Sequence, residues 1–156
     1  SYNRPKMELI IFVGGQASGK STFFKRYFSD THIRLNLDML KTRHREKILF
    51  NACLEAKQKV VIDNTNPSKF DRKIYVQDAK NAHFKVIAYY FDSGLDDALL
   101  RNEQRVGKAK IPRVGVISTF KKLEIPELDE GFDEIYSVSI DQENGFNVRL
   151  LYLREQ

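Results

Sequence analysis

Short apolar runs and stretches of helical periodicity alternate along most of the chain. Residues 8–13 form a β-branched and apolar run that ends at two glycines, a pattern typical of a strand buried on both faces. Phe23, Phe24 and Tyr27 then recur at three- and four-residue spacing, which predicts a helix directly after the glycines. The full pattern predicts strands at residues 8–13, 33–37, 59–62, 84–91, 134–140 and 146–153, and helices at 19–28, 46–58, 68–81, 95–105 and 114–123.

The order of these elements predicts the fold class. Strands that alternate with helices indicate right-handed crossovers, and therefore an α/β fold with a mainly parallel sheet. Only the turn-like segment 141–145 separates the last two strands, so we expect them to form an antiparallel edge. No repeat or linker interrupts residues 7–156, which we interpret as one domain. Residues 1–6 are interpreted as an extension, either a cloning remnant before a native start at Met7 or a linker from a longer protein.

Composition excludes several classes of protein. Of 156 residues, 42% are hydrophobic and 30% are charged, which is typical of a globular domain and excludes disorder as the main state. The longest apolar runs, 9–13 and 86–91, are far shorter than the roughly 20 residues of a membrane-spanning helix, so we expect a soluble protein with no membrane partner. The start lacks a secretory signal, which predicts a cytoplasmic setting. A single cysteine, Cys53, excludes an internal disulfide and a zinc site and is predicted to be a helical core residue.

Basic residues are concentrated before residue 124. Residues 124–156 hold nine acidic and two basic residues, which leaves 24 basic against 12 acidic residues in the rest of the chain. Clustered Lys and Arg lower the cost of approaching phosphates, so this part of the chain favours a polyanionic partner such as nucleic acid or a nucleotide. The alternative is a charged surface that serves solubility alone.

Residues 14–22, Gly-Gly-Gln-Ala-Ser-Gly-Lys-Ser-Thr, match the phosphate-loop pattern G-x-x-x-x-G-K-[ST] between a predicted strand and a predicted helix. Backbone amides of such a loop point at the β-phosphate, Lys20 reaches the β- and γ-phosphates, and the Ser21 hydroxyl is placed for Mg²⁺. The expected ligand is ATP or another nucleoside triphosphate with Mg²⁺. The residues predicted to bind it in this loop are Gly15, Gln16, Ala17, Ser18, Gly19, Lys20, Ser21 and Thr22.

Two aspartates end predicted strands, at the sheet edge where ligands collect in α/β folds. Asp38 follows Asn36 and Leu37, and it is our candidate for the carboxylate that takes the proton of an acceptor hydroxyl; capping of the next helix is the alternative. Asp63 follows an apolar strand and is predicted to support Mg²⁺ through water, or else to organise the loop after it. Thr65 and Asn66 of that loop are predicted either to hydrogen-bond the acceptor, together with Asp63, or to build the turn.

Two basic clusters accompany these carboxylates. Arg101 and Arg105 lie four residues apart, so on one helix they would share a face and converge on a polyphosphate, with Lys108 and Lys110 continuing the track. Residues 95–123, called the lid below, are therefore predicted to be a helical lid that supplies positive charge; a solvated basic face is the alternative. The second cluster is expected to hold acceptor phosphates, or else to be ordinary helix surface, and consists of Lys41, Arg43, His44, Arg45 and Lys47.

Taken together, these segments resemble the polynucleotide 5′-hydroxyl kinase family of the P-loop phosphotransferase superfamily. Residues 14–22 match the ATP loop, Asn36-Leu37-Asp38 is similar to the Asn-x-Asp element, residues 60–67 (Val-Val-Ile-Asp-Asn-Thr-Asn-Pro) resemble the loop after the third strand, and residues 101–105, followed by Ile111-Pro112, resemble the lid. The resemblance spans about residues 9–123.

The resemblance implies a three-layer P-loop kinase-like fold, a helical lid, and Mg²⁺-dependent transfer of the ATP γ-phosphate to 5′-OH ends of RNA or DNA. It also implies that Asp38 is the general base and that Arg101 and Arg105 contact the donor phosphates. Two features depart from the family. Leu37 stands where arginine is frequent, and the acceptor-binding arginine after Asp38 has only Lys41 or Arg43 as equivalents. No Asp-x-Asp-Gly-Thr segment is present, so we expect no phosphatase activity in this chain.

Two other functions are compatible with the same motifs. One is a small-molecule kinase on the same scaffold, of the zeta-toxin type or acting on a nucleoside or sugar, which needs no extended basic surface. The other is a nucleotide-dependent binding module, although a switch has no need of an acceptor base such as Asp38. No residue pattern selects RNA over DNA, one triphosphate over another, or an oligomeric state.

Overall fold

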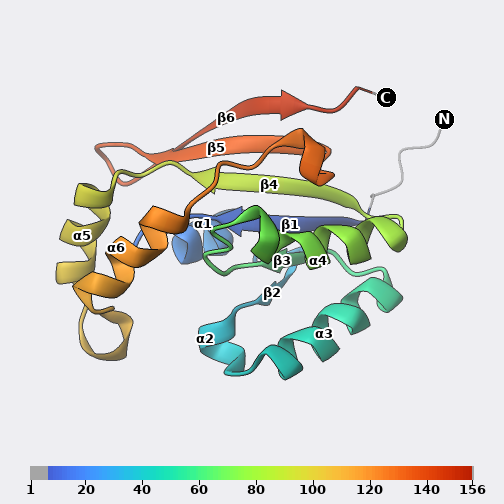
Figure 1. Cartoon of the computed structure of the whole chain (residues 1–156), viewed down its shortest axis with the longest axis horizontal. Coiled ribbons are helices and arrows are strands. Elements are labelled where there is room, and N and C mark those ends of the chain that lie inside the picture. Colours follow the sequence, from blue (N-terminus) through green and yellow to red (C-terminus); the bar gives the residue numbers. More distant parts are fainter. Residues whose placement is uncertain (1–6, 156) are drawn as a thin grey trace.

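The computed structural model describes residues 7–155, so the extension expected at residues 1–6 lies outside the described residues. Within that range six strands form one sheet in the order β2-β3-β1-β4-β5-β6 (Figure 1). Neighbouring strands pair parallel except β5 and β6, which form the antiparallel edge that the sequence predicts. The strands are β1 (Glu8–Val13), β2 (Ile33–Leu35), β3 (Val60–Ile62), β4 (Lys85–Phe91), β5 (Glu134–Ile140) and β6 (Phe146–Leu153).

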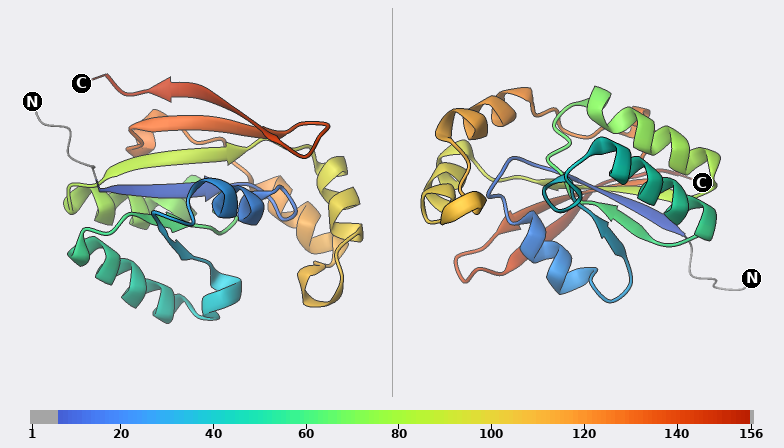
Figure 2. Two further views of the ribbon diagram at one scale, coloured as in Figure 1. Left: turned by 180° about the vertical axis from the view of Figure 1, so that it is seen from behind. Right: turned by 90° about the horizontal axis from the view of Figure 1, so that it is seen from below.

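Helices cover both faces of the sheet and give the predicted three-layer α/β fold. Helix α1 (Lys20–Tyr27) lies on one face, and α3 (Arg43–Ala56) and α4 (Lys69–Asn81) lie on the other (Figure 2). At one end of the sheet lie α2 (Leu37–Leu40), α5 (Leu95–Glu103) and α6 (Arg113–Lys122), with a short 3₁₀ turn at Gly107–Ala109 (η1) between the last two helices. A second 3₁₀ turn, Leu128–Glu130 (η2), lies at the opposite end, before β5. No helix in the described part of the chain is both long and apolar enough to cross a membrane.

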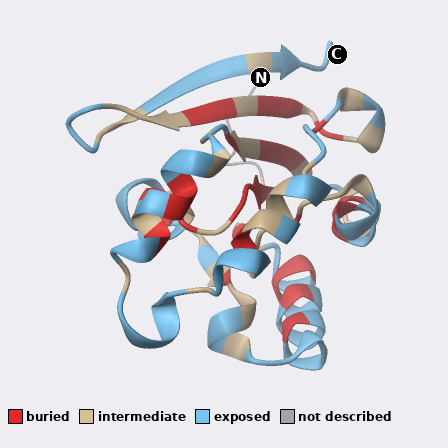
Figure 3. Cartoon of the chain, turned by 60° about the vertical axis from the view of Figure 1, so that its left-hand side comes forward, coloured by how far each residue is buried: buried red, intermediate tan, exposed pale blue. Residues whose placement is uncertain are grey.

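Strand β1 shows why the sheet is buried on both faces. Leu9, Ile11 and Val13 belong to the core beneath α3 and α4, whereas Ile10 and Phe12 belong to a second core beneath α1. The second core is rich in aromatic rings, which include Phe23 of α1. Burial decreases toward the antiparallel edge, where β6 is exposed along most of its length and β5 beside it is mostly buried (Figure 3). The central strands therefore form a rigid base for the loops at their carboxyl ends.

Several element boundaries differ from the sequence prediction, and three of the differences lie near the predicted site residues. Strand β2 ends at Leu35 because Asn36 caps α2, a short helix that the sequence did not predict, by accepting a hydrogen bond from Met39 N at 3.0 Å. Helix α3 begins at Arg43 instead of residue 46 because Thr42 caps it. Helix α5 ends at Glu103, before Arg105. Cys53 is buried on α3, as predicted.

Candidate active site

The phosphate loop connects β1 to α1 at the carboxyl edge of the sheet. Two of its residues have left-handed backbone angles, Ala17 with φ 60° and Gly19 with φ 94°, so that the chain curls around its own amides. Ser18 is buried, and its hydroxyl donates to Gly15 O at 2.7 Å. Among residues 7–155, the amides of residues 15–19 have no protein acceptor. The loop therefore presents unpaired N–H donors at a helix N-terminus, the arrangement that binds phosphate.

Lys20 is folded back into this loop. Its ammonium donates to Gly15 O at 2.6 Å, to Gly14 O at 3.0 Å and to Ser18 Oγ at 3.3 Å. Desolvation within the loop lowers the pKa of Lys20 from 10.5 to about 8, while the nearby carboxylates of Asp63 and Asp38 oppose the shift. Because phosphate oxygens are stronger partners than carbonyls for an ammonium group, Lys20 is placed to exchange these contacts for those of a polyphosphate.

Ser21 and Asp63 lie together beside the loop and supply the oxygen atoms that Mg²⁺ prefers. The carboxylate of Asp63 is buried, and Arg34 of β2 donates to Asp63 Oδ2 at 2.7 Å and to Ser21 Oγ at 3.0 Å. No cluster of three His, Cys, Asp or Glu residues that could hold a metal is found within residues 7–155. This donor set fits Mg²⁺ held partly by phosphate and water, rather than a metal enclosed by protein. Sequence reasoning missed Arg34, whose only signal was a charge within an apolar strand.

The lid is a pair of packed helices with a small core of its own, made by Ala98, Leu99 and Val116. Arg101 leaves α5 toward the phosphate loop and donates to Ala17 O at 3.3 Å. Arg105 lies beyond the end of the helix, so the prediction that both arginines share one helical face is wrong. Both arginines nevertheless line the same pocket. Asn102 Oδ1 accepts from Ile111 N at 2.9 Å and Asn102 Nδ2 donates to Ile111 O at 2.6 Å, and these two bonds close the loop that carries Arg105.

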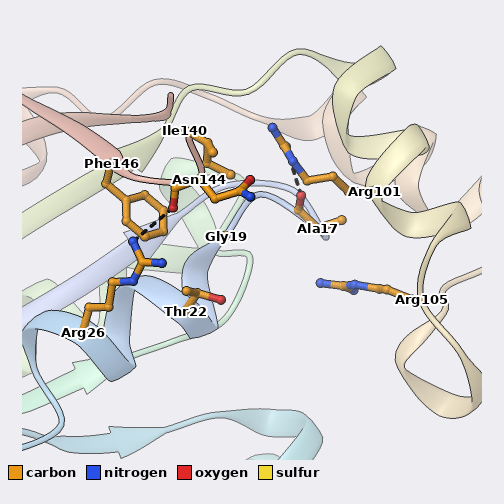
Figure 4. Close-up of a pocket in the computed structure, with 9 residues that line it drawn as sticks. All are labelled: Ala17, Gly19, Thr22, Arg26, Arg101, Arg105, Ile140, Asn144 and Phe146. Carbon is orange, nitrogen blue, oxygen red and sulfur yellow. Dashed lines mark hydrogen bonds between the residues drawn. The ribbon is translucent and has the colours of Figure 1, made fainter. Parts of the chain in front are cut away.

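A pocket of about 280 Å³ lies between the phosphate loop, the lid arginines and the β5–β6 turn (Figure 4). Arg26 of α1 spans one wall, with its guanidinium 5.2 Å from the Phe146 ring centroid and a hydrogen bond of 3.1 Å to Asn144 O. Sequence reasoning missed this wall because its residues come from opposite ends of the chain. The residues that line the pocket are Ala17, Gly19, Thr22, Arg26, Arg101, Arg105, Ile140, Asn144 and Phe146.

Asp38 is the second residue of α2, a helix that begins two residues after β2 ends, whereas the sequence predicts a strand that continues to residue 37 and ends at Asp38. Its helix has only four residues and is capped by Asn36, and the next helix, α3, is capped by Thr42, so the capping alternative for Asp38 is wrong. Asp38 is exposed, and among the described residues no hydrogen bond or ion pair occupies its carboxylate. Its charge opposes the lowering of the Lys20 pKa, which places Asp38 within electrostatic reach of the phosphate loop. The structure thus brings a free carboxylate to the same edge as the loop.

The residues predicted to bind an acceptor are divided between surface and core. Lys41 and Arg43 are exposed beside Asp38, and the guanidinium of Arg43 donates to the Tyr75 hydroxyl at 2.9 Å. Thr65 is half-buried, and its carbonyl accepts from Gly14 N at 3.0 Å. Asn66 is buried, and its amide donates to Phe12 O at 2.8 Å, so in this structure its side chain builds the loop. The other basic residues near α2, which are His44, Arg45 and Lys47, are exposed.

Comparison with known proteins finds no family model that matches the chain. A bifunctional polynucleotide phosphatase/kinase of Schizosaccharomyces pombe is 29% identical over 138 residues, which are 84% of this chain and 33% of that protein. A putative bifunctional polynucleotide phosphatase/kinase of Acanthamoeba polyphaga mimivirus is 29% identical over 141 residues, which are 86% of this chain and 34% of that protein. The chain therefore spans about a third of the length of the curated relatives that it matches.

Solved structures with a similar fold share little sequence with the chain. Kti12 of Chaetomium thermophilum in complex with ADP-AlF₃ has a TM-score of 0.62 and 20% identity, over 87% of this chain and 92% of that one. A gluconokinase of Sinorhizobium meliloti 1021 has a TM-score of 0.61 and 16% identity, over 89% and 86%. The chain thus has the fold of the P-loop kinases, and its sequence is similar to the polynucleotide phosphatase/kinases, as its motifs predict.

Proposed function

We propose that this chain transfers the γ-phosphate of ATP to 5′-OH ends of RNA or DNA, with Asp38 as the general base. The observation that carries the proposal is the similarity to two proteins named for polynucleotide kinase activity, over 84% and 86% of the chain. The geometry supports it, because the phosphate loop and a free carboxylate occupy one edge of the sheet. A basic surface beside that carboxylate suits a polyanionic acceptor better than a neutral metabolite.

On the donor side, the loop amides and Lys20 bind the β- and γ-phosphates, and Arg101 and Arg105 stabilise charge on the transferred group. The pocket beside Arg26 and Phe146 receives the nucleoside. Support for this division comes from the position of Arg101, which contacts the loop and lines the same pocket. Lys20 and the two arginines thereby surround a polyphosphate from opposite sides.

Ser21 and Asp63 are the residues that would hold Mg²⁺, Ser21 directly and Asp63 through water. When bound, the ion neutralises charge on the β- and γ-phosphates. Arg34 donates to Ser21 Oγ at 3.0 Å and to Asp63 Oδ2 at 2.7 Å, and so holds the hydroxyl and the buried carboxylate close to each other.

On the acceptor side, Asp38 orients the 5′-hydroxyl and accepts its proton as the oxygen attacks the γ-phosphorus. The new O–P bond forms while the bond from phosphorus to the β,γ-bridging oxygen breaks, and ADP leaves with the electron pair. Lys41 and Arg43 bind phosphates of the acceptor strand near the attacking hydroxyl. Asp38 is suited to this role because no group within residues 7–155 competes for its carboxylate.

The experiment is label transfer from γ-labelled ATP with Mg²⁺ to a panel of acceptors. The panel contains RNA and DNA oligonucleotides that end in 5′-OH, the same strands with a 5′-phosphate, a nucleoside and gluconate. The proposal predicts transfer only to strands with a 5′-OH end. Transfer to a small molecule alone would replace the polynucleotide by a small-molecule acceptor, and ATP binding with no transfer would favour a nucleotide-dependent switch.

A further inference from the structure

The position of Asp38 depends on two hydrogen bonds that α2 makes to the loop after β3. Asn36 donates its side-chain amide to Asp63 O at 2.7 Å, and Leu37 N donates to Asn64 Oδ1 at 2.9 Å. Leu37 N is a first-turn amide, which has no partner inside its own helix. A helix of four residues has little stability of its own, so these contacts, together with the packing of Leu40 on the core and the hydrogen bond from Arg45 to Leu40 O, determine where its carboxylate lies.

The Asn64 amide is itself held from behind by a buried carboxylate. Asn64 Nδ2 donates to Glu46 Oε2 at 2.8 Å, and Glu46 of α3 is only 3% exposed. The other oxygen, Glu46 Oε1, accepts from the Tyr75 hydroxyl and from Arg43 Nη1 at 3.4 Å. Burial, and then the bond to Glu46, raises the pKa of Tyr75, which keeps this phenol a donor.

The chemistry of these groups allows only one orientation of the Asn64 amide. A carboxylate only accepts hydrogen bonds, so Glu46 selects the NH₂ end of Asn64 and leaves its carbonyl to face Leu37 N. A flipped amide would set oxygen against oxygen at Glu46 and N–H against N–H at Leu37. Both ends of the amide are therefore engaged within the protein, each in one hydrogen bond.

We propose that Asn64 is a positioning residue for Asp38, and that Glu46 sets the orientation of Asn64. The two hydrogen bonds that link Glu46, Asn64 and Leu37 connect helix α3, through the loop after β3, to the first turn of α2. This inference rests on the proposed function to the extent that Asp38 is the base. The arrangement of the three residues itself is independent of what Asp38 does.

An isosteric exchange of charge tests this chain of contacts. Asn64→Asp sets a second carboxylate against Glu46, and we expect kcat to fall about 10- to 100-fold with unchanged ATP affinity. Glu46→Gln alone leaves one oxygen for the donors of Asn64 on one side and of Tyr75 on the other, so it is expected to lower kcat, although by less than Asn64→Asp. In the double variant the amide introduced by Glu46→Gln donates to the new carboxylate, whose other oxygen accepts from Leu37 N, so kcat returns to within about twofold of the wild type.

Two further measurements separate positioning from stability and from the proposed function. Glu130→Gln weakens another buried pair, Arg72–Glu130, which joins α4 to η2, and should lower the unfolding midpoint without changing kcat. Amide hydrogen exchange of Leu37 should become faster in Asn64→Asp and slow again in the double variant. This readout holds even if the wild type phosphorylates no 5′-OH end, an outcome that overturns the proposed function alone. If kcat or the exchange protection of the Leu37 amide falls in Asn64→Asp and the double variant does not restore it, the positioning role is overturned.

Discussion

The donor and acceptor sides of the site are built in different ways. The donor side centres on one continuous segment, residues 14–22, whose contacts lie mostly within itself, such as Lys20 to Gly14 O and Gly15 O. The acceptor side centres on Asp38, an exposed residue on a four-residue helix that is anchored by Asn36 and Asn64. A local loop forms its binding geometry as soon as the strand and helix around it form. The acceptor carboxylate takes its place only when three separate segments have packed together.

This difference predicts that the two sides fail separately. A change on the donor side should alter ATP binding, whereas a change on the acceptor side should alter transfer and leave ATP binding intact. Variants of the phosphate loop, the lid and the pocket wall test the donor half of this comparison.

Lys20→Met is expected to have the largest effect on the donor side. It removes the only side-chain cation within the loop and leaves a side chain of similar length, so kcat/KM should fall about 10²- to 10³-fold. Equilibrium binding of ATP should weaken as well. Normal ATP affinity in this variant would show that the ammonium does not contact the phosphates.

Gly15→Ser tests the packing of the lid on the loop. A Cβ at residue 15 would lie 2.0 Å from the ring of Phe120 on α6, so the ring or its helix has to move, at a cost of about 1–3 kcal/mol in the free energy of unfolding. A shift of the helix also strains the bond from Gln16 Nε2 to Thr119, which is 2.9 Å long, and should raise KM for ATP. Gly94→Ser is the matched control, because its Cβ meets nothing within 4 Å. Denaturant titration and initial rates compare the two.

The pKa of Lys20 makes ATP binding dependent on pH. Above a pKa of about 8 the nucleotide-free protein loses the Lys20 proton, so ATP affinity should be about tenfold weaker at pH 9 than at pH 7. Stability changes in the opposite direction: between pH 8 and 10.5 the unfolded chain holds more protons, and the free energy of unfolding of the nucleotide-free protein rises. Calorimetric titration in two buffers would detect the proton uptake. In Lys20→Arg the affinity should be flat over this range.

Arg26→Gln is expected to have the smallest effect. It removes the cation above the Phe146 ring and the bond to Asn144 O, so KM for ATP should rise about two- to fivefold with unchanged kcat. Lys25→Gln removes the same charge from the neighbouring position outside the pocket and should leave KM unchanged. Equal KM values for the two variants would show that the nucleoside does not enter this pocket.

How much could be predicted from the sequence follows the same division. The phosphate loop was predictable because its residues are contiguous. The α/β class followed from the period of the apolar residues, and the antiparallel edge from the short turn at residues 141–145. Helix α2 was not predicted, because the side-chain cap at Asn36 and the contact at Asn64 outweigh the strand-like pattern of residues 33–37. The order of the strands depends on contacts between distant segments, which a single sequence does not display.

Arg34 and Phe146 illustrate the same limit within the site. Both belong to strands whose pattern indicates only burial or an edge, and each becomes a site residue when its strand is placed beside the loop. The prediction for Arg105 was partly correct. Arg101 and Arg105 line the same pocket, as expected, but they do not share a helical face, because α5 ends at Glu103.

The most direct test of the whole account is single-turnover transfer from protein-bound γ-labelled ATP to a 5′-OH oligonucleotide, with wild-type and Asp38→Asn proteins compared. Asparagine keeps the shape of the side chain and removes its ability to accept the proton. We expect equal ATP affinity in the two proteins and a transfer rate about 10²- to 10⁴-fold lower in the variant. Transfer at the wild-type rate, or loss of ATP binding in Asp38→Asn, would contradict the assignment of Asp38 to the acceptor side.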